Sequence, residues 1–250
     1  MLEAFTYMFK DNMLKKKAIM YFIFALLGNL FTQISLIFAP PARGVAAPPQ
    51  YYILSILSAV VMMIPTGYLI SCIKAIMEQN ENPVLPFLNV KNNFVLGLKF
   101  FISITLLSLA FGVIFIILSI LVAIIFPVAT KAMFYTFLTI LFIIPFLIII
   151  FYSPAFCCIL AKKEWFTTFF RFVRVTKLVG LNIANYLKRF GLMVLLVLAS
   201  GILSSIINIL CPSNYLGAAL MALVISAISS YTVFVFAHLT AKSIKAECIE

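Results

Sequence analysis

The stretch AKKEWFTTFFRFVRVTKLVGLNIANYLKRF (residues 161–190) decides how the rest of the chain is interpreted. It holds seven lysine and arginine residues, and apolar runs too long for a soluble core lie on both sides of it. On a helix turning about 100° per residue, the aromatic residues and most of the cations separate onto opposite sides. The apolar side holds Trp165, Phe166, Phe169, Phe172 and Val173, and the other holds Lys163, Thr167, Arg171 and Arg174. A basic amphipathic helix of this kind is expected to lie among lipid headgroups. We call this stretch the basic island.

The composition predicts an integral membrane protein. Hydrophobic residues make up 65% of the 250 residues and charged residues 10%, with a mean hydropathy of +1.20. Ordinary globular proteins are about half apolar and about a quarter charged, so this chain has too little polar surface to fold in water. The net charge of +11 is interleaved with apolar runs. We therefore interpret the cations as topology determinants and contacts to anionic lipid headgroups, with no nucleic-acid partner.

Six apolar runs are long enough to cross the hydrocarbon core of a bilayer. They cover residues 18–39, 51–77, 97–126, 132–161, 191–210 and 215–240. The first run is too long for a signal peptide and is expected to stay in the protein. Proline residues are expected to kink the second and fourth runs. The predicted fold is all-α, a single transmembrane domain over residues 1–250.

The distribution of cations predicts the orientation. Six spans place both termini on one side, and 16 of the 18 lysine and arginine residues fall on that side. Only Arg43 and Lys131 fall on the other. Because cytoplasmic segments carry the excess of cations, both termini are predicted to be cytoplasmic.

Amphipathic pieces precede every second span. They cover residues 2–17, 84–99 and 162–189, ahead of the first, third and fifth spans. One interpretation is a repeat of three units, each an amphipathic cytoplasmic elbow helix followed by a hairpin of spans. The alternative is that any membrane hairpin has polar ends, and the sequence leaves both open.

Short motifs are spread over residues 60–240. They are Pro65-Thr66-Gly67-Tyr68, Leu85-Pro86, Phe94, Gly97-Leu98-Lys99, Pro154-Ala155, Ala161, Phe169-Phe170 and Asn185-Tyr186-Leu187. In these motifs the chain resembles an uncharacterised prokaryotic membrane family, catalogued as domain of unknown function 4013. Members tend to be acidic after the Leu-Pro pair, whereas Asn89, Lys91, Asn92 and Asn93 here are neutral or basic. The resemblance implies a multi-span bundle in a prokaryotic cell (plasma) membrane and brings no known activity.

Residues typical of catalysis are missing from the predicted spans. Between the membrane interfaces there is no Asp, Glu, Lys or Arg, so no carboxylate pair is available for acid–base chemistry. His238 is interpreted as a polar tip near the interface, with a proton-linked role as the alternative. The five cysteines lack metal or redox spacing and are expected to be buried, inert thiols. We expect no enzyme activity, cofactor or metal.

Two groups of polar or helix-breaking residues mark a possible cavity. Asn29 and Gln33 lie one turn apart in the first span, where they either bind a substrate or bond to a neighbouring helix. Pro65, Gly67 and Tyr68 are compatible with a broken-helix binding site, although Pro and Gly are common in membrane helices generally.

The basic island supplies the candidate surface for lipid or partner binding. Its residues are Lys162, Lys163, Trp165, Arg171, Arg174, Lys177, Lys188 and Arg189. Anionic lipid headgroups are the first expected ligand, and another membrane or cytoplasmic protein is the second. The function expected is that of a non-enzymatic scaffold, accessory or lipid-interacting component. The alternative is a permease-like transporter of a neutral or lipidic substrate.

Small residues recur every four positions in the last two spans. The fifth has Ser200, Ser204 and Asn208, and the sixth has Ala218, Ala222, Ser226 and Ser230. Stripes of small residues let two helix backbones approach closely. We therefore predict that the two stripes face each other, with Asn208 hydrogen-bonded across the seam.

Overall fold

The computed structural model describes residues 13–40, 46–78, 85–125, 131–163, 172–211 and 214–244. Within these ranges the chain forms helices joined by turns and short irregular segments, and contains no strand. The helices are α2 (Leu14–Ile37), α3 (Pro49–Glu78), α4 (Val90–Ile125), α5 (Lys131–Lys163), α6 (Phe172–Gly180), α7 (Ile183–Leu210) and α8 (Tyr215–Ala241). The predicted all-α class is confirmed.

Five of these helices are long and apolar enough to cross a membrane, namely α2, α3, α4, α7 and α8. They coincide with five of the six predicted spans. The remaining prediction, residues 132–161, falls on α5, where the described part contains a shorter apolar helical segment, Leu147–Lys162. The chain is therefore a multi-pass membrane protein with five candidate spans.

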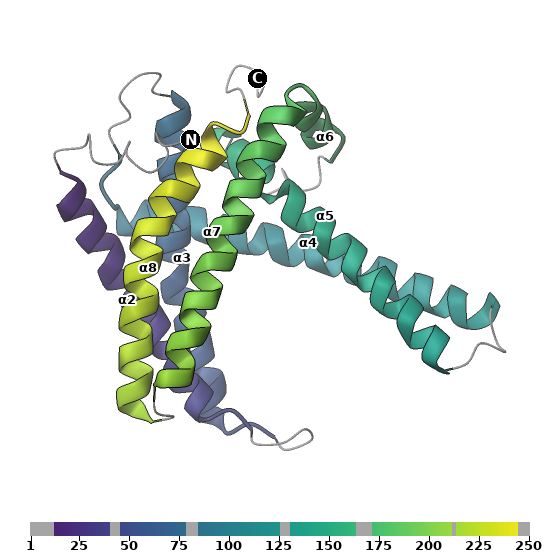
Figure 1. Cartoon of the computed structure of the whole chain (residues 1–250), viewed down its shortest axis with the longest axis horizontal. Coiled ribbons are helices and arrows are strands. Elements are labelled where there is room, and N and C mark those ends of the chain that lie inside the picture. The colour runs from purple at the N-terminus through teal and green to yellow at the C-terminus, as the bar shows by residue number, and fades with distance from the viewer. Residues whose placement is uncertain are drawn as a thin grey trace.

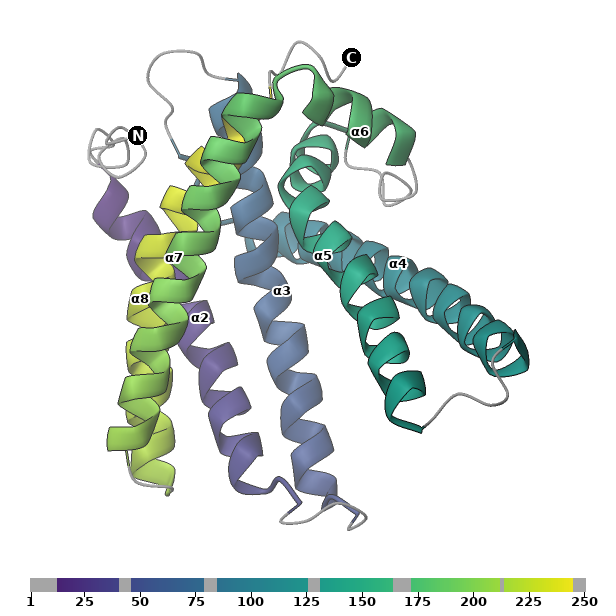
Figure 2. The ribbon, with the colours of Figure 1, turned by 45° about the vertical axis from the view of Figure 1, so that its right-hand side comes forward.

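Helices α2, α3 and α8 pack together as the centre of the molecule, and α7 lies along α8 (Figure 1). Helices α4 and α5 leave this group as a pair and extend to one side (Figures 1 and 2). The start of α2, the end of α3 and the end of α8 lie on the same side as α6. We call this side the α6 side.

Aromatic rings and hydroxyl groups hold α2, α3 and α8 together. Tyr21, Tyr68 and Phe234 contribute one ring from each helix, with centroids 6.0–6.3 Å apart. Towards the opposite side, Ser58 Oγ of α3 donates to the Gly28 carbonyl of α2 at 2.9 Å. Without water inside a bilayer, such interhelical hydrogen bonds and close packing take the place of the hydrophobic effect.

The crossing of α3 and α4 depends on two glycines. A Cβ atom added to Gly67 would lie 1.7 Å from the backbone oxygen of Asn93, and one added to Gly97 would lie 1.8 Å from that of Met63. The two helix backbones are therefore in direct contact, which only residues without a side chain permit. Gly67, predicted as part of a broken-helix binding site, packs against the backbone of α4.

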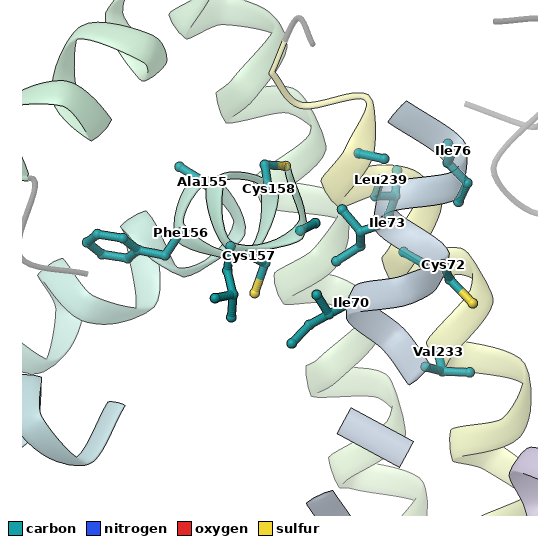
Figure 3. Packing of buried hydrophobic residues seen from close by; sticks show 14 of the residues in the cluster. Ile70, Cys72, Ile73, Ile76, Ala155, Phe156, Cys157, Cys158, Val233 and Leu239 are labelled. Atoms are coloured by element: carbon teal, nitrogen blue, oxygen red, sulfur yellow. The ribbon is translucent and has the colours of Figure 1, made fainter. Parts of the chain in front are cut away.

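The end of α5 near the α6 side packs against the central group. Residues 154–161 are buried without interruption. Figure 3 shows Cys157 and Cys158 of this segment near Ile70 and Ile73 of α3 and Leu239 of α8. The Cys158 thiol donates to the Thr240 carbonyl of α8 at 3.2 Å. The predicted burial of cysteine is confirmed at Cys72, Cys157 and Cys158, whereas Cys211 is partly exposed and Cys248 lies outside the described residues.

The basic island is not one helix. Residues 164–171 lie outside the described ranges; after them α6 ends at Gly180, turn residues Leu181 and Asn182 follow, and α7 begins at Ile183. Residues 183–190, predicted to belong to the island, are the first turns of α7. The helix axis changes direction at this turn, which the periodicity of aromatic and basic residues does not encode.

The structure also differs from the amphipathic piece predicted at residues 84–99. Helix α4 begins at Val90, seven residues before the predicted span, so the second half of this piece continues directly into α4. The side chain of Asn89 explains the start, because its Oδ1 accepts from the Asn92 backbone N–H at 3.2 Å and caps the helix. The piece at residues 2–17 is described only from Met13 onwards, and α2 starts at Leu14.

The prediction that the small residues of the last two spans face each other is wrong, because those of α8 pack against a different helix. Ala222 and Ser226 of α8 are fully buried, but Ser226 Oγ accepts from Asn29 Nδ2 of α2 at 3.0 Å. On α7, Ser200 and Ser204 of the predicted stripe are partly buried, and Ser200 lines a hollow together with Ser229 and Thr232 of α8. Beside the stripe, a Cβ atom at Gly201 would meet nothing within 4 Å. The small residues of α8 therefore face α2. The side chain of Asn208 lies outside what the structure describes.

Candidate functional site

The connection between α3 and α4 is held by two side chains from other parts of the fold. Lys17 of α2 is 1% exposed, and its Nζ donates to the backbone carbonyl of Leu85. The same ammonium lies 4.8 Å from the centroid of the Phe87 ring. The Tyr68 hydroxyl donates to the carbonyl of Pro86 at 3.0 Å. Two successive carbonyls are thus fixed, which sets the position of the segment that leads into α4.

A hollow of about 490 Å³ lies between this connection, the end of α3 and the start of α4. We call it the α3–α4 hollow. Its lining residues are Ser71, Lys74, Ala75, Glu78, Pro86, Phe87, Asn89, Lys91, Asn92, Asn93, Val95, Leu96 and Lys99. Three lysines against one glutamate make the wall net positive. The hollow is within the range of volumes typical of small-ligand sites, about 300–1,000 Å³.

The inner wall of the hollow is polar. Asn93 is 2% exposed, and its Oδ1 accepts from the Ser71 hydroxyl at 2.9 Å. Its Nδ2 is buried and has no hydrogen-bond partner within the described residues. A buried amide N–H without a partner is costly in a folded protein, so this group is suited to a ligand or an ordered water.

The structure places four of the five predicted cavity residues, all except Gln33, in contacts between or within helices. Asn29 bonds to α8, as described above, and Gln33 is partly exposed. Pro65 lies inside α3 and is buried, and Tyr68 is fully buried against α2 and α8. Neither the α3–α4 hollow nor a smaller one of about 270 Å³, between α2, α3, α7 and α8, is lined by any of these five residues.

Part of the basic island lies on the α6 side. Lys162 at the end of α5, Lys177 in α6 and Lys188 in α7 are exposed, and Arg174 is partly exposed. The Nε of Arg189 donates to Asn185 Oδ1 at 2.9 Å. Trp165 and Arg171 lie outside the described residues, as does the side chain of Lys163. The structure therefore brings the three exposed lysines to neighbouring elements, since α6 contacts both α5 and α7.

Helix α6 is attached to the molecule by its apolar side. Val175, Leu178 and Val179 are buried, and they recur at the spacing of one helix face. Val173, predicted to lie on the apolar side of the island, is 73% exposed.

An aromatic and amide cluster fixes the start of α7. The Tyr186 hydroxyl donates to the Phe151 carbonyl of α5, and the rings of Phe151, Tyr186 and Phe190 pack within 5.1–6.3 Å. Asn185 Nδ2 donates to the Lys242 carbonyl after α8 at 3.2 Å. These contacts hold the cations at the start of α7 in position.

Sequence reasoning missed Lys17 and the α3–α4 hollow. The sequence analysis interpreted all the cations as topology determinants and lipid contacts. Of the three consecutive lysines Lys15, Lys16 and Lys17, only Lys17 is buried. The signal was present, because Lys17 lies one turn before Tyr21, on the stripe of α2 that continues through Ala25 and Gly28. His238 is also buried, at 4% exposure, which corrects its interpretation as an interfacial tip. Across the described ranges, no group of three or more His, Cys, Asp or Glu residues could hold a metal ion.

These features define an all-helical, multi-pass membrane protein with a positively charged hollow at one end of two crossing helices. Residues 51–211 match the model of a family described as "Protein of unknown function (DUF4013)". The chain belongs to this family, as its motifs indicated. Neither the curated proteins nor the solved structures contain a match to the chain.

Proposed function

We propose that this protein is a non-enzymatic component of a prokaryotic plasma membrane, a scaffold or accessory subunit that binds anionic lipid headgroups through a basic cytoplasmic face. The observation that carries the proposal is the set of exposed lysines Lys162, Lys177 and Lys188 on three neighbouring elements of the α6 side. Each cation near an anionic membrane surface contributes on the order of 1 kcal/mol to binding.

In this proposal α5 also crosses the bilayer, as the fourth of six spans, and both termini lie in the cytoplasm. Helix α6 lies at the depth of the headgroups as an elbow between α5 and α7. Its buried side, Val175, Leu178 and Val179, supports this placement because it attaches the helix to the bundle and leaves Lys177 exposed.

The packed centre favours this function over a permease. The polar groups expected to line a transport cavity are engaged in contacts between helices, since Asn29 bonds to Ser226 and Tyr68 bonds to Pro86. Gly67 is in backbone contact with α4. A permease would need these groups to face a solvated path.

The full-length protein, purified in neutral detergent, tests the proposal by native mass spectrometry with equimolar phosphatidylglycerol and phosphatidylcholine. We expect preferential retention of phosphatidylglycerol, weakening as salt increases. The triple variant Lys162→Gln/Lys177→Gln/Lys188→Gln should lose most of this preference, by about fivefold per removed charge. The matched variant Lys162→Arg/Lys177→Arg/Lys188→Arg should keep it. A preference unchanged in the glutamine variant would contradict the proposal.

A further inference from the structure

We propose that the α3–α4 hollow is a binding site for a phosphate group, carried either by an anionic lipid headgroup or by a small phosphorylated solute. The site is distinct from the lysines of the basic face, which belong to α5, α6 and α7. Glu78, the last residue of α3, is among its lining residues, and this end of α3 lies on the α6 side (Figure 2).

The charge of the hollow favours an anion. Lys74 from α3 and Lys91 and Lys99 from α4 line it, together with one acid, Glu78. The lysines come from both walls, since α3 supplies one and α4 the other two. A phosphate in the hollow would therefore be approached by cations from two sides.

The start of α4 adds a second favourable contribution. Asn89 and Asn92, in the capping turn, line the hollow. The positive end of the helix dipole lies at this turn, where anions are stabilised. At 36 residues, α4 is long enough for this end to carry its full partial charge.

The buried amide of Asn93 is the observation that points to a specific ligand. The Ser71 hydroxyl lies 2.9 Å from the Asn93 Oδ1 and 3.1 Å from the Gly67 carbonyl oxygen, and shares its one proton between them. The Asn93 Nδ2 is buried and has no partner within the described residues. Asn93 cannot be displaced easily, because its backbone oxygen contacts Gly67 at the helix crossing. In the proposed complex the side chains that cover Nδ2 move aside, so that an oxygen of the phosphate group accepts from Nδ2 while its other oxygens meet the lysines.

The outer wall is apolar as well as basic. Phe87 is half exposed and Val95 is 42% exposed, and both line the hollow. A phosphate with an attached glycerol or acyl chain would contact these side chains, whereas inorganic phosphate would not. The two sources of phosphate can therefore be distinguished by comparing ligands with the same headgroup and different tails.

Calorimetric titration in neutral detergent tests the site with three probes. The full-length protein carries Lys162→Gln/Lys177→Gln/Lys188→Gln throughout, so that the lysines of the basic face do not contribute to the binding. Dioctanoyl phosphatidic acid and glycerol 3-phosphate share a phosphomonoester, and dioctanoylglycerol has the chains without it. We expect phosphatidic acid to bind and dioctanoylglycerol not to bind. Binding of glycerol 3-phosphate with similar affinity would identify a solute site, and binding of phosphatidic acid alone would identify a lipid headgroup site. Failure of both phosphates to bind would overturn the proposal.

Variants of lining residues test whether phosphatidic acid binds in the hollow. Lys91→Gln, on the exposed surface of α4, should weaken phosphatidic acid binding about fivefold. Asn93→Asp, close in shape but with an acceptor replacing the donor, should abolish it. The control Lys16→Gln, an exposed lysine of α2 outside the hollow, should bind as the wild type does. Unchanged binding in Lys91→Gln, with an unchanged melting temperature, would also overturn the proposal.

The glutamine variant of the basic face separates this site from the proposed function. If it loses the preference for phosphatidylglycerol and still binds phosphatidic acid in the hollow, both proposals stand. If it keeps the preference while Lys91→Gln loses phosphatidic acid binding, only the function proposed for the basic face fails.

Discussion

Lys17 shows how one side chain can have a role that its neighbours do not. Three consecutive lysines begin α2, yet only Lys17 points into the molecule, where it bonds to Leu85 and lies near Phe87. Bonds to charged donors contribute more than neutral ones, about 1.5–3 kcal/mol, but burying an ammonium also costs desolvation energy. We expect the hydrogen bond to the Leu85 carbonyl to outweigh this cost.

Replacing Lys17 with Met tests this contact. The change leaves the Leu85 carbonyl without its donor, so we expect the free energy of unfolding to fall by about 1–3 kcal/mol. Lys16→Met, at an exposed position, should change it by less than about 0.5 kcal/mol. Unfolding in dodecyl sulfate mixed micelles measures both. Equal stability of the two variants would mean that desolvation cancels the hydrogen bond.

Two glycines of α4 provide a second comparison. Gly97→Ala would place a methyl group 1.8 Å from the Met63 carbonyl oxygen, so α3 and α4 must move apart. Overpacking of this kind typically costs about 1–3 kcal/mol. Gly112→Ala meets nothing within 4 Å and removes a poor helix former, so it should be neutral or stabilising by up to about 1 kcal/mol. Melting temperatures that fall equally in both variants would argue against the close crossing.

Among the helices, α8 illustrates what a stripe of small residues can and cannot predict. Its periodicity correctly identified the buried side, since Ala218, Ala222 and Ser226 are all buried. It did not identify the partner helix. Proximity in sequence favoured α7, but α2 supplies the Asn29 amide that bonds to Ser226, and this pairing joins residues 197 positions apart.

A pair of alanines on α8 tests the α2–α8 packing. Ala222→Leu inserts three carbon atoms at a fully buried position and should lower stability by about 1–3 kcal/mol. Ala219→Leu, the same change at an exposed position, should have little effect. Thermal unfolding followed by circular dichroism compares them. Gly201→Leu on α7 should also be mild, whereas a large loss there would favour the α7–α8 seam.

Helix positions were largely predictable because long apolar runs have few alternatives to a membrane helix. The ends were less predictable. Asn89 starts α4 early by capping it, and Leu181-Asn182 divides the basic island, because local hydrogen bonds at these points outweigh the apolar pattern. The α3–α4 hollow could not be predicted, since it is made by residues from two helices and the connection between them.

At the scale of the whole molecule, the two described ends of the chain lie on one side. The start of α2 and the end of α8 lie on the α6 side, together with the exposed lysines of α5, α6 and α7 (Figure 1). The split of cations predicts that this side is cytoplasmic. This prediction uses only the positions of the cations along the sequence and does not depend on how the helices pack.

Single cysteines in a background without native cysteines test the orientation. Asn92→Cys, exposed at the start of α4, should resist a membrane-impermeant maleimide in intact cells and react after permeabilisation. Ala47→Cys, before α3 on the other side, should react in intact cells. Removal of the native thiols is needed because Cys211 is partly exposed. Labelling of Asn92→Cys but not Ala47→Cys in intact cells would invert the orientation.

The bond between Lys17 and Leu85 also constrains the order of events during synthesis. The two residues are 68 positions apart, so α2 leaves the ribosome before its partner carbonyl has been made. Until α3 has followed, the ammonium can be hydrated only by extending towards the headgroups, as lysines near helix ends do. Helix α2 therefore reaches its final position only after α3 has been inserted and the chain has turned back. A nascent chain halted before Leu85 would hold its first helix in a different position from the finished protein.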